Sequence, residues 1–116
     1  MAELNLHAPE MMLTNLYEVP GQRIVEHFGL VHGGTVRAKH FGRDLFAGLQ
    51  NAVGGELKAY TELMEEARAE AISRMRSQAR ELGANAVVGV YFTSAGVTSG
   101  AVEILAYGTA VRVEKV

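Results

Sequence analysis

Apolar residues recur at helical spacing between Glu56 and Leu82. The apolar stripe consists of Tyr60, Met64, Ala67, Ala71, Met75, Ala79 and Leu82. Acidic residues dominate the first half of this stretch and arginines the second half, an order that complements the helix dipole. The pattern therefore predicts one long helix whose stripe packs on a sheet, with small alanines that allow a close approach.

The pattern changes sharply at Gly83. Glycine suits the position just after a helix end, where φ is positive. The valine-rich run that follows, Ala86–Thr93, is typical of a strand buried on both faces. A turn is predicted over residues 94–100 and a long last strand over Ala101–Val113, so these two strands should form a hairpin.

The chain before the long helix predicts shorter strands. Leu13–Val19 is expected to be a short edge strand, and Arg23–His32 a strand with apolar side chains on both faces. The glycine pair Gly33-Gly34 should break this strand, and Thr35–His40 then predicts a second, half-exposed one.

A short helix is predicted over Phe41–Val53, ended by Gly54-Gly55. The first twelve residues lack periodicity and are expected to form a flexible extension. Residues 13–116 then make one domain, which suits a chain of 116 residues with 48% hydrophobic composition.

Composition excludes several kinds of protein. The chain has no Cys, which rules out disulfides, thiolate metal sites and cysteine nucleophiles. A formal charge of −2 does not indicate a basic surface for binding nucleic acid. No stretch is apolar enough to span a membrane. Because the first residues lack a basic start and an apolar core, a cytoplasmic location is expected.

The predicted strands carry more apolar surface than one helix can cover. In the last strand, Ile104 and Ala106 fall on one face while Leu105, Tyr107 and Val111 fall on the other. Another copy of the chain is the simplest cover for such a surplus. The sequence therefore predicts a homo-oligomer.

Several short motifs occur in a characteristic order. The most specific is the segment Leu82–Val90, and the others are Arg43-Asp44, Gly54-Gly55, Tyr60, Ala67-Arg68 and Gly108-Thr109-Ala110-Val111. From about Leu13 to Val113 the chain resembles the YbjQ-like family, which is labelled putative heavy-metal-binding. The resemblance implies an α+β, two-layer subunit with one long helix on a small antiparallel sheet. Its β-α-β-β core would be dodecin-like, and the subunits would assemble as a homopentameric ring. No established activity is implied.

Metal binding suggested by the family label would have to use histidine and carboxylate ligands. The histidines are His7, His27, His32 and His40. Soft heavy metals prefer the thiolates that this chain lacks, so such a site would favour harder ions or zinc. Lone histidines without i, i+4 spacing are more often exposed or half-buried strand residues, and that interpretation is preferred. No metal ligand is therefore assigned, and any cofactor stays unknown.

An alternative function centres on the start of the predicted short helix. Arg43 could hold a carboxylate or phosphate there, with Asp44 and Arg68 in the same cleft between subunits. That would make the protein an enzyme or an anion-binding module, whereas ion pairing among these residues is the simpler interpretation. No catalytic residue is predicted. The leading expectation is a non-enzymatic pentamer that binds a small ligand or a metal at its subunit interfaces.

Overall fold

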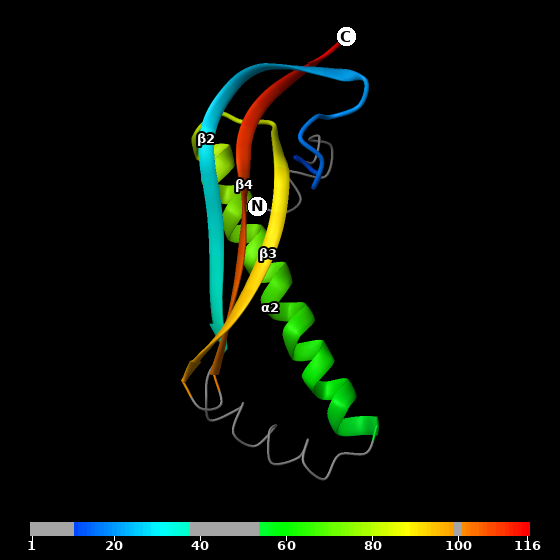
Figure 1. Ribbon diagram of the computed structural model, residues 1–116, viewed down its shortest axis with the longest axis vertical. Coiled ribbons are helices and arrows are strands. Elements are labelled where there is room, and N and C mark those ends of the chain that lie inside the picture. Colours follow the sequence, from blue (N-terminus) through cyan, green and yellow to red (C-terminus); the bar gives the residue numbers. More distant parts are fainter. Residues whose placement is uncertain (1–10, 38–53, 99–100) are drawn as a thin grey trace, which may run out of the picture.

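The computed structural model describes residues 11–37, 54–98 and 101–116. The described elements are β1 (Met12–Leu13), β2 (Gln22–Arg37), α2 (Gly54–Glu81), β3 (Ala86–Thr98) and β4 (Ala101–Lys115). The strands form one sheet in the order β1-β3-β4-β2. Figure 1 shows α2 crossing behind this sheet at an angle. The short helix predicted over Phe41–Val53 lies outside the described residues.

The sheet is mixed, because β1 runs parallel to β3 while β4 is antiparallel to both of its neighbours. The expectation of a wholly antiparallel sheet is corrected in this respect. The edge strand predicted over Leu13–Val19 is reduced to the two residues of β1. The backbone N–H of Leu16 donates to the Thr14 hydroxyl, a local hydrogen bond that competes with strand pairing. The Leu16 carbonyl still accepts a hydrogen bond from Gly89 N–H at 2.7 Å.

β2 runs without a break through Gly33-Gly34, so the predicted interruption there is wrong. Gly33 faces the helix, and a Cβ on it would lie 2.5 Å from the backbone N of Met75 and in overlap with the carbonyl of Ala71. The absence of a side chain therefore serves close packing of α2 on β2 rather than a turn.

The hairpin between β3 and β4 is longer than predicted. Residues 94–98 were expected in a turn, but they belong to β3, and Thr98 lies opposite Ala101. Serine and glycine weaken intrinsic strand preference, yet the backbone ladder with β4 holds them extended.

The main core lies between α2 and the sheet. Ala67, Ala71, Met75 and Ala79 of the predicted stripe are all fully buried. Strand residues of this core include Val31, Val87, Ile104, Ala106 and Ala110. Leu82 was expected on the stripe but is 45% exposed, because α2 ends at Glu81.

A second, smaller core lies on the opposite face of the sheet. It consists of Val19, Ala86, Val88, Val111 and Val113, with Ile24 packed against it. Because β4 contributes to both cores, the expectation of apolar side chains on both faces is confirmed.

The end of α2 has the geometry predicted for Gly83. This glycine has φ 95°, its N–H donates to the Arg80 carbonyl, and Ala84 N–H donates to the Ala79 carbonyl. These two hydrogen bonds form a Schellman cap, and Ala79 and Ala84 both lie in the main core. Within the described residues, no helix combines the length and apolar composition that a membrane span needs.

Candidate functional site

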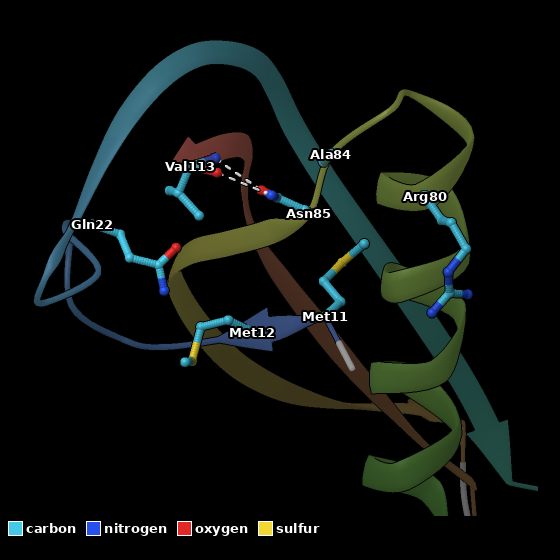
Figure 2. A pocket seen from close by; sticks show the side chains of 7 residues that line it. All are labelled: Met11, Met12, Gln22, Arg80, Ala84, Asn85 and Val113. Carbon is cyan, nitrogen blue, oxygen red and sulfur yellow. Dashed lines mark hydrogen bonds between the residues drawn. The ribbon is translucent and has the colours of Figure 1, made fainter. Parts of the chain in front are cut away.

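A pocket of about 440 Å³ lies where α2 ends and β1 begins (Figure 2). It is lined by Met11, Met12, Gln22, Arg80, Ala84, Asn85 and Val113. These residues come from the segment at β1, the start of β2, the end of α2, the connection from α2 to β3, and β4. Only the folded chain brings them together, so sequence spacing alone gave no signal for this pocket.

One polar side chain of the pocket wall has a structural role. The Asn85 amide donates from Nδ2 to the Val113 carbonyl at 3.0 Å, and its Oδ1 accepts from Val113 N–H at 2.8 Å. The side chain thus replaces a strand partner for Val113 at the end of β4. The other polar side chains that the described residues place on the wall are the Gln22 amide and the Arg80 guanidinium, and none of these residues is acidic.

The two methionines of the pocket do not form a metal chelate. Met11 is buried in the main core, whereas Met12 is 46% exposed. Figure 2 shows their side chains extending in different directions at the start of β1, as expected for consecutive residues of extended chain. A single soft cation therefore cannot contact both thioethers without a change in β1.

The histidines within the described ranges also fail to converge. His27 and His32 are exposed on β2, and no group of three or more His, Cys, Asp or Glu in the described part of the chain could hold a metal ion. His7 and His40 lie outside that part. The donor set that can be described does not fit a heavy-metal site.

The predicted anion cleft is only partly visible. Arg68 lies on an exposed position of α2, away from the buried stripe. Arg43 and Asp44 lie outside the described residues.

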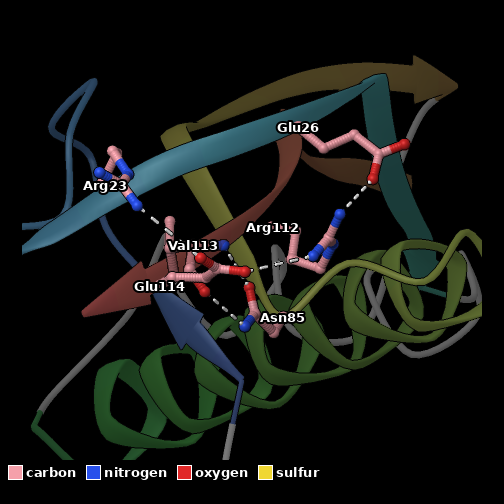
Figure 3. A network of polar contacts seen from close by, with 6 residues as sticks. All are labelled: Arg23, Glu26, Asn85, Arg112, Val113 and Glu114. Carbon is pink, nitrogen blue, oxygen red and sulfur yellow. Dashed lines mark hydrogen bonds and ion pairs between the residues drawn. The ribbon is translucent and has the colours of Figure 1, made fainter. Parts of the chain in front are cut away.

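A network of ion pairs joins β2 and β4 at the surface (Figure 3). Arg112 contacts Glu26 at 2.8 Å and Glu114 at 3.6 Å, and Arg23 lies 3.9 Å from Glu114. The hydrogen bond to Glu26 raises the pKa of Arg112 above its ordinary value. All four side chains are largely exposed, so water and salt screen these pairs and each stabilises the fold little.

Tyrosines gather on the face of the sheet opposite α2. The hydroxyls of Tyr17 and Tyr91 are 3.2 Å apart, and the ring centroids of Tyr91 and Tyr107 are 6.2 Å apart. Gly89 (φ 61°) makes room for the Tyr17 ring, because a Cβ there would lie 3.0 Å from it. The hydrogen bond with Tyr17 raises the pKa of Tyr91. Tyr17 and Tyr91 are far apart in the sequence, so no local pattern indicated this cluster.

Two strands of the sheet have open edges. Among the described residues β2 pairs only with β4, and beyond Val90 the outer edge of β3 has no strand beside it. Large apolar side chains are exposed on these strands: Leu30 is 70% exposed, Val36 55% and Phe92 45%. An apolar pocket of about 200 Å³ lies beside the open part of β3 and is lined partly by Val90 and Phe92.

The middle of the β2 edge is capped by side chains from α2. The Gln78 amide oxygen accepts a hydrogen bond from His32 N–H at 2.8 Å, and Arg74 donates to the Gly34 carbonyl. His32 and Gly34 are alternate residues of a strand, so both point these groups away from β4. The helix thereby satisfies backbone groups that an incoming strand would otherwise use.

Comparison with known proteins gives one family. A family model described as "Putative heavy-metal-binding" matches residues 11–114. A UPF0145 protein of Hahella chejuensis is 57% identical over 104 residues, covering 90% of this chain and 100% of that relative. A UPF0145 protein of Thermus thermophilus is 54% identical over 105 residues, covering 90% of this chain and 92% of that relative.

A solved structure shares the fold. The crystal structure of a protein of unknown function from Pediococcus pentosaceus, assigned to the DUF74 family, superposes with a TM-score of 0.62. The match covers 90% of this chain and 98% of that one, at 14% sequence identity. At this identity the likeness concerns the fold alone.

Proposed function

The chain belongs to the YbjQ family, the one described as putative heavy-metal-binding, and on that premise we propose that it is a non-catalytic subunit of a homopentameric ring. The ring would bind a small ligand and work in the cytoplasm. The number five comes from the family resemblance. The observation that supports assembly as such is that one sheet has open strand edges on two opposite sides.

Edge-to-edge pairing between copies would account for the two strand edges that are open in the single chain. If β2 of one copy pairs with the open part of β3 of the next, the contact is heterologous and repeats around a closed ring. Closure would pair both of these open stretches, which otherwise are a hazard for uncontrolled aggregation. It would also cover Leu30 or Val36 on β2 and Phe92 on β3, the exposed apolar side chains described above.

The hydrogen bonds between side chains of α2 and the backbone of β2 limit where such pairing can occur. Because His32 and Gly34 already bond to Gln78 and Arg74, a neighbouring strand would pair on either side of this short stretch. β2 has 16 residues, which leaves ample edge outside the capped stretch.

The ligand part of the proposal favours a small molecule over a heavy metal. The donors that the described residues offer do not fit a heavy-metal site, since Cys is absent and no ligand cluster is found among them. The alternative proposal is an enzyme or anion-binding module in an intersubunit cleft around Arg43, Asp44 and Arg68.

Native mass spectrometry of protein purified without chelator tests the assembly. We expect five copies, and we expect Leu30→Lys or Val36→Lys to give smaller species, because in one of them a charge would lie on the paired part of the edge strand. Leu82→Lys is the matched control, since Leu82 is also exposed but follows α2 rather than lying on an edge. A wild-type monomer at micromolar concentration, or behaviour of both edge variants equal to that of Leu82→Lys, would contradict the edge-pairing proposal.

A further inference from the structure

The pocket between the end of α2 and β1 is lined by none of Leu30, Val36 and Phe92, the exposed apolar residues on which the assembly proposal rests. We propose that this pocket binds a small organic carboxylate, with the carboxylate at Arg80 and the hydrocarbon part against Met11. The volume, about 440 Å³, falls within the range of about 300 to 1,000 Å³ that is usual for small-molecule sites. A compact ligand of modest length therefore fits.

The charge of the pocket lining favours a ligand with an anionic head group. Among the described residues that line the pocket, Arg80 alone is charged, so this lining is net positive. A guanidinium presents a planar fork of donors that matches a carboxylate in a bidentate arrangement. The start of the Arg80 side chain is fixed, because its carbonyl accepts the Gly83 hydrogen bond in the helix cap.

The rest of the wall selects an apolar body. Met11, Ala84 and Val113 are 7%, 8% and 6% exposed, so each presents a small apolar area to the pocket, and Met12, which is 46% exposed, adds a larger one. Methionine is unbranched and adapts to irregular apolar shapes. Because the Asn85 amide is already bonded on both sides to Val113, it offers a ligand little beyond shape.

The Gln22 amide could also bind a polar group at the far end of the ligand, although binding does not require one. In Figure 2, Gln22 and Arg80 lie on opposite sides of Met11. A ligand with its carboxylate at Arg80 and a hydroxyl or carbonyl at its other end could therefore use both residues. An inorganic anion would leave the apolar wall in contact with water, and a cation would be repelled by Arg80.

Methionine methyl groups report binding directly. The full chain, as purified, is labelled with ¹³C at its methionine methyls and titrated with sodium hexanoate as the probe. We expect the Met11 and Met12 signals to shift saturably, while Met64 and Met75, which lie outside the pocket, stay unchanged. Hexylammonium chloride has the same chain with the opposite charge and should cause no saturable shift at equal concentration.

Two variants that each remove one positive charge from α2 separate the site from general charge effects. Arg80→Gln should weaken hexanoate binding about tenfold, since it removes one charge-assisted contact. Lys58→Gln removes the same charge from an exposed position on the same helix outside the pocket lining and should leave binding unchanged. Equal shifts with hexanoate and hexylammonium, equal loss in both variants, or no shift at Met11 and Met12 would overturn the proposal. Native mass spectrometry on the same samples shows separately whether the ring is intact, so failure of the two proposals can be told apart.

Discussion

The side chain of Gln78 on α2 accepts a hydrogen bond from the backbone N–H of His32 on β2, at 2.8 Å. This contact joins a helix to the edge of the sheet that it covers, and it occupies a group that normally recruits another strand. The edge of β2 is therefore open in its outer parts and closed at its centre.

Loss of this cap should expose the His32 amide. We expect Gln78→Ala to speed hydrogen exchange at His32 and to lower the free energy of unfolding by about 0.5 to 1 kcal/mol. Gln78→Glu keeps the acceptor oxygen and should retain most of the protection. Amide exchange measured by NMR compares the two variants with the wild type. Equal exchange at His32 in Gln78→Ala and the wild type would show that the cap has no protective effect.

Gly33 should be the glycine of β2 that tolerates substitution least. An alanine Cβ there would overlap the backbone of Ala71 and Met75, so Gly33→Ala should lower the free energy of unfolding by about 1 to 3 kcal/mol or more.

Gly34→Ala is the natural control, because its nearest atoms would lie 3.7 Å away in ordinary contact. We expect this change to shift stability by no more than about 0.5 kcal/mol. Urea unfolding of both proteins makes the comparison. Similar midpoints would mean that α2 can move off β2 at little cost.

Asn85 should contribute to stability through the end of β4. Asn85→Ala removes two hydrogen bonds to the Val113 backbone, which together contribute about 1 to 3 kcal/mol. Thermal or urea unfolding measures the loss. Asn15→Ala changes an exposed asparagine and should have almost no effect, so an equal loss in both variants would argue against the Asn85 bridge.

The tyrosine pair should give a distinct alkaline titration. The hydrogen bond with Tyr17 raises the pKa of Tyr91 above 10.0, so it favours the protonated phenol in the folded state. The stability it contributes is present below pH 10 and is lost as the pH rises through the pKa of the folded protein.

We expect Tyr17→Phe to lower the pKa of Tyr91 towards 10.0 and to remove this extra loss of stability in alkali. NMR of ¹³C-labelled tyrosine rings follows each phenol separately. An unchanged Tyr91 titration in Tyr17→Phe would assign the raised pKa to another cause.

Local rules predicted the parts of this fold that local interactions determine. The cap at Gly83 follows from the properties of glycine, and the buried stripe through Ala67, Ala71 and Met75 follows from helical periodicity. By contrast, Gly33 was interpreted as a break, because a sequence does not show that a helix backbone will lie against it.

Long-range contacts account for most of what the sequence missed. Three features join segments that are far apart in the chain. They are the parallel pairing of β1 with β3, the contact of the Tyr17 ring with Gly89, and the pocket around Arg80. Periodicity reports which side chains face inward, but it does not report which segments lie beside one another. Arg43 and Asp44 remain a prediction from the sequence.

The strand order has a consequence for how this chain can fold. β4 is the last described element along the chain, yet it lies between β3 and β2 and, among the described strands, it alone pairs with both. During synthesis, β2 and β3 therefore emerge before the strand that both of them pair with, and this part of the sheet cannot form until β4 is available. Truncation within β4 should consequently remove the pairing that holds β2 and β3 in one sheet.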